Sequence, residues 1–287
     1  GEDNNLLSAY GKKRTPLDEE KIMQYYEHFR YIVPQGSVMS VLGNPYVIGS
    51  LSNCIVIPEI YDSYGGVMFA DQQLVQLMKR RCGVGLDIST LRPSGTPVSN
   101  AAGTATGAVS FMERFSNTTR EVAQSGRRGA LMITMDINHP ESKKFAGIKQ
   151  DLKRVTGANI SLKLSDEFMN AVKNDKEYIQ KWPINSDNPI IENKIKAIDL
   201  WNTIVECAHK TAEPGLIFWD RQHKYSTSSV YPQYKNISTN PCAEIAMGND
   251  SCRLIALNMF GCVREPFTNK ACFNFEKWYE ICYEGQH

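Results

Sequence analysis

The segment Asn240-Pro241-Cys242-Ala243-Glu244 places an amide, a thiol and a carboxylate within five consecutive residues. Proline stiffens the backbone beside the thiol, so three chemically different groups can converge on one small ligand. Two further cysteines, Cys54 and Cys252, lie upstream and downstream of this segment. The combination indicates a radical site, although the five residues alone fit an ordinary turn with a solvated Glu244 equally well.

The cysteines do not follow a metal-binding pattern. The chain has eight cysteines and five histidines, but no Cys-x-x-Cys pair and no histidine cluster beside the cysteines. Structural zinc sites depend on such spacings, so we expect no metal site. Cysteines outside the radical site are expected to be buried apolar fillers: Cys82, Cys207, Cys262, Cys272 and Cys282.

Short apolar runs alternate with helix-forming segments along the chain, which predicts an α/β fold. The predicted strands are Cys54–Pro58, Val84–Ile88, Ala130–Met135, Ala158–Leu164 and Gly215–Trp219. The predicted helices are Pro16–Arg30, Asp71–Arg81, Ala108–Val122, Asp166–Lys173 and Ala197–Thr211. Residues 1–15 read as a loose polar lead-in, while Arg92–Thr106 and Gln150–Gly157 read as long irregular loops, which in compact domains are usually functional or disordered.

The composition is that of a globular protein with one large domain, since 287 residues are 42% hydrophobic and 22% charged. A formal net charge of +1 gives no broad electrostatic field, which disfavours binding of a nucleic acid polymer. The sequence shows no long apolar run and no secretory leader, so we expect no membrane association and a cytoplasmic setting with reduced thiols.

Six segments, in this order, carry a resemblance to a known family: Leu51–Pro58, Cys82–Gly85, Gln124–Ala130, Asp136–Pro140, Pro214–Asp220 and Asn240–Glu244. An ordered series of this kind is far more specific than any single motif. From about Val33 onward the chain resembles the catalytic (large) subunit of ribonucleotide reductases.

The resemblance implies the first half of a ten-stranded α/β barrel, with a central finger loop. Residues 1–45 would form a small helical lead-in, and residues 46–287 the first half-barrel, the finger and the start of the second half. Asn240–Met247 would be the fingertip and Cys252–Asn258 the next strand. Half a barrel exposes strand edges, so we expect a complementary C-terminal segment, whether truncated or a separate chain.

The resemblance also implies an activity, the reduction of ribonucleotides to 2′-deoxyribonucleotides by thiyl-radical chemistry. Cys242 would carry the radical, Glu244 would act as general base, and Asn240 would orient the ribose hydroxyls. Cys54 and Cys252 would be the dithiol that supplies two electrons. An external, thioredoxin-like dithiol would then reduce that pair.

Substrate contacts are expected from Ser52 and Asn53, beside the strand cysteine, and from the backbone at Gly83 and Gly85, where missing side chains permit close approach. A tight strand entry explains the two glycines equally well. The substrate would be a ribonucleoside di- or triphosphate, and the sequence leaves this choice open.

Regulation by deoxynucleotides or ATP at a subunit interface is also implied, and with it a homo-oligomer. The two irregular loops occupy the places of the family's effector loops. The residues expected to contact the effector are Asp62, Ser63, Arg92, Lys153 and Arg154. Arg127 and Arg128 are either further phosphate ligands or ordinary surface charge.

Members of the family differ in their radical source. The step from Cys242 to Cys252 is short, as in the adenosylcobalamin-dependent class II, and we expect this cofactor. The alternative is a class I large subunit with no cofactor bound directly, in which a metal-containing small subunit generates the radical.

Two other functions compete. A non-catalytic fragment could bind nucleotide or a partner chain without turnover, but the retained catalytic set argues against decay. A glycyl-radical enzyme has a similar barrel, but the expected pair of Cys54 and Cys252 argues against it.

Overall fold

The computed structural model describes residues 17–122, 126 and 128–286, which form two compact units. One unit comprises residues 43–252, and the other combines residues 17–42 with 253–286. The sequence predicted a single boundary near residue 45, with residues 46–287 in one domain, whereas in the structure residues 253–286 group with residues 17–42. The predicted domain division remains a prediction. The lead-in at residues 1–15 lies outside the described residues, as do Gln124, Ser125 and Arg127 of the Gln124–Ala130 segment.

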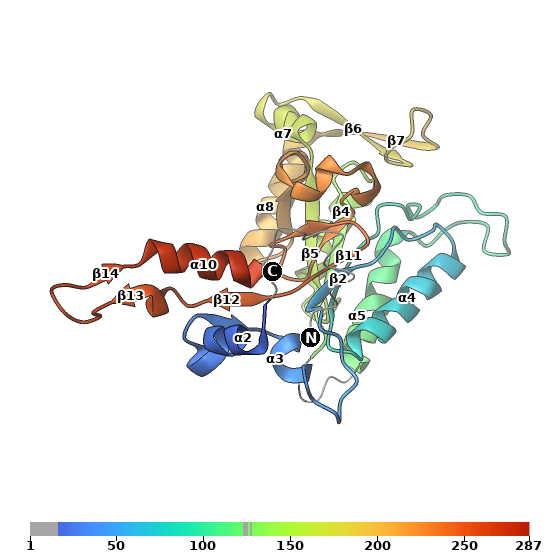
Figure 1. Ribbon diagram of the computed structural model, residues 1–287. Coiled ribbons are helices and arrows are strands. Elements are labelled where there is room, and N and C mark those ends of the chain that lie inside the picture. Colours follow the sequence, from blue (N-terminus) through green and yellow to red (C-terminus); the bar gives the residue numbers. More distant parts are fainter. Residues whose placement is uncertain (1–16, 123–125, 127, 287) are drawn as a thin grey trace. The chain divides into compact units, whose positions relative to one another are not determined.

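A six-stranded mixed sheet forms the centre of the larger unit, in the order β11-β2-β3-β4-β5-β8 (Figure 1). Five strands are parallel: β2 (Cys54–Val56), β3 (Gly83–Asp87), β4 (Leu131–Asp136), β5 (Asn159–Leu164) and β8 (Gly215–Phe218). The sixth, β11 (Asp250–Cys252), is antiparallel to β2. All five predicted strands and the α/β class are confirmed, whereas the predicted first half of a ten-stranded barrel remains a proposal.

Helices connect the parallel strands, as this topology requires. They are α4 (Tyr64–Met78), α5 (Met112–Glu121, after the 3₁₀ turn Ala108–Phe111), α6 (Ser142–Gly147, followed by the 3₁₀ turn Ile148–Gln150), α7 (Asp166–Lys173) and α8 (Ala197–Thr211). The helix α4 begins before the predicted Asp71 because Ser63 caps it, accepting a hydrogen bond from the Gly66 amide at 3.0 Å. The first turn of α4 contains two glycines, which are poor helix formers, so the sequence pattern did not indicate that the helix begins here.

The two faces of the sheet differ in composition, because successive side chains in a strand alternate between faces. One face carries aliphatic residues such as Val84, Ile133 and Leu162, which join Leu74 and Phe115 of the helices in the main hydrophobic core. Apart from Met132 on β4, the opposite face of β3, β4 and β5 carries small and polar residues: Gly83, Gly85 and Asp87 on β3, Thr134 and Asp136 on β4, and Asn159, Ser161 and Lys163 on β5. A short hairpin of β9 (Ser238–Thr239) and β10 (Ala246–Met247) has its first strand near β3 and β4.

Further elements were not predicted from the sequence. A hairpin of β6 (Glu177–Trp182) and β7 (Ile191–Lys196) precedes α8, and α9 (Trp219–Tyr225) follows β8, with 3₁₀ turns at Thr227–Val230 and Pro232–Tyr234. The β7 strand is largely exposed and charged, so it lacks the apolar alternation by which strands are recognised.

The smaller unit contains α2 (Glu19–Tyr26), a 3₁₀ turn (Glu27–Phe29), β1 (Ile32–Pro34), α3 (Ser37–Val41), β12 (Ile255–Leu257), a 3₁₀ turn (Met259–Cys262), β13 (Val263–Arg264), β14 (Cys272–Phe273) and α10 (Phe275–Gln286). Strand β12 pairs with β1. The predicted strand Cys252–Asn258 is therefore divided between two sheets, and the predicted helix Pro16–Arg30 is shorter. Among the described residues, no helix combines the length and apolar character needed to cross a membrane.

Candidate functional site

The residues Asn240–Ile245 form the tip of the β9–β10 hairpin. The Ala243 amide donates to the Asn240 carbonyl at 3.0 Å, and the Ile245 amide donates to Asn240 Oδ1 at 3.3 Å. Ala243 adopts a left-handed backbone with φ of 62°. The turn buries the Asn240 side chain completely and leaves Cys242 and Glu244 exposed. The thiol of the predicted radical cysteine is thus presented at a loop tip.

Cys54 and Cys252 lie directly opposite each other on the antiparallel strands β2 and β11. Cα atoms of such cross-strand partners are about 4.5–5.5 Å apart, which falls within the range that a disulfide can span. Both side chains are buried, and all eight cysteines are thiols in the structure. The two cysteines, almost 200 residues apart in the sequence, are therefore placed as a redox pair would be.

Asn240 connects the hairpin to this pair. Its Nδ2 donates to Cys54 Sγ at 3.7 Å, a hydrogen bond between two buried side chains. Since the same side chain also accepts from the Ile245 amide, it fixes the turn and reaches the thiol at once. Three of the predicted catalytic residues thus belong to one connected site.

The pKa of Cys252 is raised, first by a hydrogen bond with the Cys54 thiol, then by burial and by the charges of Cys54 and Glu244. The Cys252 thiol therefore stays protonated to a higher pH than an ordinary thiol. The Glu244 carboxylate contributes to the upward shift of the Cys252 pKa only after the Cys54 hydrogen bond, burial and the charge of Cys54.

Gly83 and Gly85 serve the hairpin. A Cβ on Gly85 would lie 1.9 Å from the Thr239 carbonyl oxygen, and one on Gly83 would lie 2.9 Å from Pro241 Cγ and 3.4 Å from Cys54 Sγ. The overlap at Gly85 is with rigid backbone and is sterically prohibitive, whereas at Gly83 the ring of Pro241 would have to shift. The missing side chains therefore let the hairpin approach the sheet, which neither sequence interpretation of these glycines anticipated.

Ser52 and Asn53 precede Cys54 in the chain. The Asn53 amide donates to the Cys252 carbonyl at 2.9 Å, and the Ser52 carbonyl accepts from Cys82 Sγ at 3.4 Å. Burial raises the pKa of the Cys82 thiol. Both residues thus border the thiol pair, and their contact with substrate remains a prediction.

The polar residues beneath the hairpin were not predicted from the sequence. Thr134 Oγ1 donates to Asp87 Oδ2 at 2.7 Å and lies 2.8 Å from Ser238 Oγ. Lys163 Nζ pairs with Asp87 Oδ2 at 2.9 Å, with both side chains buried. The alternation of polar and aliphatic residues in these strands could have indicated that one face of the sheet is covered by something other than helices. A face buried only against helices would be aliphatic.

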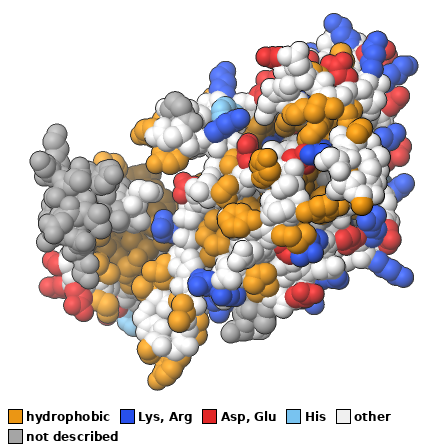
Figure 2. Space-filling model, turned by 90° about the vertical axis from the view of Figure 1, so that its right-hand side faces the viewer, with side chains coloured by type: hydrophobic (Ala, Val, Ile, Leu, Met, Phe, Trp, Pro, Cys, Tyr) orange, Lys and Arg blue, Asp and Glu red, His pale blue; other side chains and the backbone are white. Residues whose placement is uncertain are grey.

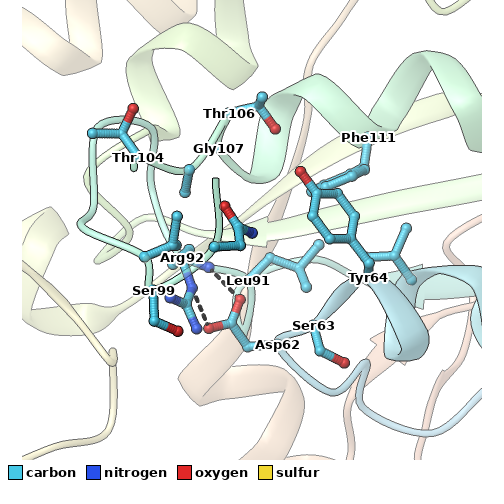
Figure 3. Close-up of a pocket in the computed structure, with 14 residues that line it drawn as sticks. Asp62, Ser63, Tyr64, Leu91, Arg92, Ser99, Thr104, Thr106, Gly107 and Phe111 are labelled. Carbon is cyan, nitrogen blue, oxygen red and sulfur yellow. Dashed lines mark hydrogen bonds and ion pairs between the residues drawn. The ribbon is translucent and has the colours of Figure 1, made fainter. Parts of the chain in front are cut away.

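A second candidate site is a cavity of about 230 Å³ beside the first irregular loop (Figure 3). Its lining includes Asp62, Ser63 and Arg92, three of the predicted effector residues. Asp62 accepts from both the Arg92 amide at 3.0 Å and Arg92 Nε at 2.8 Å, which fixes this corner of the cavity. The loop folds back on itself through a bridge between Pro97 and Thr104.

Lys153 and Arg154 do not line this cavity. Arg154 Nε pairs with Glu113 Oε1 at 2.8 Å, and the Lys153 amide donates to Asp151 Oδ1 at 3.0 Å. The end of their loop instead borders another cavity, of about 590 Å³, lined by residues that include Arg120, Arg128, Lys149, Thr156 and Asn159. The predicted effector set is therefore divided between two places.

The remaining cysteines mostly behave as fillers, since Cys82, Cys207 and Cys262 are buried. The prediction is wrong for Cys272, which is exposed on β14, and Cys282 is only partly buried. The strand β14 has only two residues, too short for the sequence pattern to indicate which side chains it buries.

Comparisons with known proteins agree with this geometry. Residues 52–285 match the family described as "Ribonucleotide reductase, barrel domain". A vitamin B12-dependent ribonucleoside-diphosphate reductase of Thermoplasma acidophilum is 35% identical over 219 residues, covering 74% of this chain and 27% of the relative. A protein of the same name from Mycobacterium tuberculosis is 30% identical over 215 residues, covering 74% of this chain and 30% of the relative.

The ribonucleoside-diphosphate reductase large subunit of monkeypox virus is 28% identical over 244 residues, covering 73% of this chain and 31% of that protein. The chain thus spans about three tenths of the length of these curated relatives. The family match covers more than half of the chain and includes the thiol pair and the hairpin that carries Cys242. The chain therefore belongs to the ribonucleotide reductase barrel-domain family.

Proposed function

We propose that this chain takes part in the reduction of ribonucleotides to 2′-deoxyribonucleotides, with Cys242 as the radical cysteine. The observation that carries the proposal is the connected site of the hairpin and the thiol pair. Cys54 lies opposite Cys252, and Asn240, two residues before Cys242, donates to Cys54 Sγ at 3.7 Å. A ribose beside Asn240 could then be reached from both the hairpin and the strands.

The first step is a hydrogen-atom transfer from ribose C3′ to the Cys242 thiyl radical, which breaks a C–H bond and forms an S–H bond. Glu244, exposed on the same turn, accepts the proton of the 3′-hydroxyl. One thiol of the Cys54–Cys252 pair gives its proton to the 2′-hydroxyl, which leaves as water, and Glu244 later returns its proton to the 3′-oxygen. The Asn240 amide keeps its charge unchanged throughout, so it can hold the ribose hydroxyls in every state.

The thiol pair completes the balance of atoms and electrons. Cys54 and Cys252 together give two electrons and two protons, a disulfide forms between them, and the products are one deoxyribonucleotide and one water. Return of the hydrogen atom from Cys242 to C3′ restores the thiyl radical. An external dithiol, of the thioredoxin type, then reduces the disulfide by exchange.

We assign the radical source to adenosylcobalamin, the cofactor of the class to which the two B12-dependent relatives belong by name. When bound, it supplies an organic radical. The chain fits such a source in one respect, because Cys242 and its neighbours Ala243, Glu244 and Ile245 are exposed and would face it. A metal-containing small subunit is the competing source.

The cavity at Asp62 and Arg92 is proposed as the site for a deoxynucleotide or ATP effector. The Arg92 guanidinium suits a phosphate oxygen, and the Asp62 carboxylate suits a sugar hydroxyl. Hydrophobic side chains gather on the side of the molecule where α4 lies, and Met68 and Phe69 of this helix are exposed (Figure 2). We propose that a second copy of the chain covers them.

The strand β8 is an edge of the described sheet, with Leu216 and Phe218 partly exposed. Exposed apolar edge strands favour pairing with a further strand. A complementary segment that closes the barrel against β8 is therefore part of the proposal.

The test combines the chain with a complementary segment from a relative, adenosylcobalamin, a ribonucleoside diphosphate or triphosphate, and dithiothreitol. We expect deoxynucleotide formation that is abolished by Cys242→Ser and retained in the matched control Cys272→Ser. Turnover that persists in Cys242→Ser would refute the radical role. Nucleotide binding without turnover would favour the non-catalytic alternative, and turnover only with an iron- or manganese-loaded small subunit would replace cobalamin.

A further inference from the structure

The hairpin that carries Cys242 is held at two carbonyl groups by side chains of a single strand. Asn159 Nδ2 donates to the Pro241 carbonyl at 3.1 Å, and Lys163 Nζ donates to the Ile237 carbonyl at 3.3 Å. The two donors are four residues apart on β5, and the two acceptors are four residues apart in the hairpin, in the opposite direction. The first strand of the hairpin therefore runs antiparallel to β5, and the hairpin is fixed near its tip and at its base.

Strand alternation explains why these donors face the hairpin. Asn159 and Lys163 share the polar face of β5, whereas Ile160 and Leu162 between them are buried in the aliphatic core. Loss of either polar side chain would leave the helix-packed core untouched. The two residues can thus be changed independently of the main packing of the fold.

The Lys163 ammonium is buried in a polar environment of its own. It pairs with Asp87 at 2.9 Å and lies 4.8 Å from the centre of the Trp219 ring. Burial lowers the pKa of Lys163, but Asp87 and Asp136 raise it, and the net shift is upward. The ammonium therefore keeps its charge and all three hydrogens, one of which it directs at the hairpin.

Asn159 acts closest to the chemistry. The carbonyl that it holds belongs to the peptide bond between Pro241 and Cys242, and that bond is planar. A donor fixed on the carbonyl oxygen therefore restrains the position of the Cys242 Cα atom. The ring of Pro241 lies against Gly83 of β3, while its carbonyl accepts from Asn159 of β5. The peptide between Pro241 and Cys242 is therefore held between β3 and β5.

From this arrangement we infer that Asn159 is a positioning residue for Cys242, and that Lys163 supports it at the base of the hairpin. The inference rests on the proposed function, in that the position of the thiol matters because Cys242 reacts. Asn159 sets where the thiol stands relative to Asn240 and the thiol pair, and it does not itself touch the reacting atoms.

The central variant is Asn159→Asp, which keeps the shape of the side chain but removes the amide donor. Asn159→Gln retains a donor on a longer arm. Asn174→Asp is the matched control, because Asn174 Nδ2 also donates to a backbone carbonyl, that of Asn170 at 2.7 Å, at the end of α7. Lys163→Arg keeps the charge, and Lys163→Met is combined with Asp87→Asn so that no buried carboxylate is left unpaired.

Two measurements on the purified chain read out the hairpin. In Asn159→Asp we expect hydrogen exchange of the peptide covering residues 238–247 to accelerate roughly threefold to tenfold, the effect of one lost hydrogen bond. We expect alkylation of Cys242, measured by mass spectrometry relative to Cys272, to change by a similar factor. Asn159→Gln should restore part of both effects, and Asn174→Asp should show neither.

Unchanged exchange and alkylation in both Asn159→Asp and the Lys163→Met/Asp87→Asn double variant would overturn the inference, whatever the activity. In the active assembly, we expect kcat of Asn159→Asp to fall with KM for the ribonucleotide unchanged, since binding groups remain in place. A loosened hairpin in a chain whose wild type never turns over would leave the positioning role intact and refute only the proposed reductase function.

Discussion

The helix-packed face of the central sheet is aliphatic, whereas on β3, β4 and β5 the face beneath the β9–β10 hairpin carries mainly glycines and polar residues. On the first face, stability comes from the area and shape of buried side chains, which tolerate exchange among similar volumes. On the second, Gly85 and Thr134 meet the backbone and hydroxyl groups of the hairpin at fixed points. The comparison indicates that one face specifies the fold and the other specifies the position of Cys242.

Leu162→Ala, on the aliphatic face, is expected to have the largest effect on stability. Leu162 is fully buried, so truncation removes transfer free energy and leaves a cavity, a loss of about 2–5 kcal/mol in the free energy of unfolding. Urea unfolding measures it. The alkylation ratio of Cys242 to Cys272 should stay unchanged in the folded variant, and a changed ratio would contradict the division between the faces.

Gly85→Ala, on the hairpin face, should cost about 1–3 kcal/mol, because the new methyl group would overlap the Thr239 carbonyl. Here we expect the hairpin to shift, so that hydrogen exchange at residues 238–247 rises along with the loss of stability. The matched control is Gly147→Ala in α6, where a Cβ meets nothing within 4 Å. Similar exchange profiles for the two variants would remove the special role of Gly85.

Thr134→Val keeps the shape of the side chain but removes the hydroxyl that bonds Asp87 and Ser238. Leaving buried partners without a donor should cost about 1–2 kcal/mol in the free energy of unfolding. Thr203→Val serves as the control, because the Thr203 hydroxyl donates to a carbonyl on the exposed surface of α8. An equal loss in the free energy of unfolding in Thr134→Val and Thr203→Val would show that the Thr134 hydroxyl stabilises the protein no more than an exposed hydroxyl does.

The smallest effect concerns alkaline pH. The folded-state pKa of Cys252 is raised above its ordinary value of 9.0, so above that pH the unfolded chain releases a proton that the folded chain keeps. This contribution to the free energy of unfolding is present below pH 9.0 and is lost as the pH rises above it. At half a pH unit above 9.0 the loss is still less than about 1 kcal/mol. Cys252→Ser should flatten the decline; an unchanged slope would exclude the shifted thiol as its source.

The strands and most helices could be predicted from the sequence because buried β-branched runs and helical periodicity are local signals. Cys54, Asn240 and Cys252 could be grouped only through the family resemblance, since strand pairing brings them together across almost 200 residues. The hydrogen bond from Asn159 to Pro241 is invisible in a single sequence, because it joins a side chain to a backbone carbonyl 82 residues away.

The effector contacts of Lys153 and Arg154 remain a prediction, and the position of these two residues could not be predicted from the sequence for a related reason. Basic residues in an irregular loop have no periodicity that shows their direction, and both lie outside the cavity that contains Asp62 and Arg92. The 3₁₀ turn and bend before β5 direct the loop to the neighbouring cavity instead.

Because β2 pairs with β11, the proposed catalytic cycle would also change the stability of the larger unit. A covalent link between Cys54 and Cys252 would close a ring spanning most of the larger unit, and cross-links over rings of this size destabilise the denatured chain by on the order of 5 kcal/mol. Each turnover would thus leave the larger unit with a disulfide and a higher melting temperature, until an external thiol reduces that disulfide. The melting temperature would therefore report what fraction of the chains has turned over and not yet been reduced.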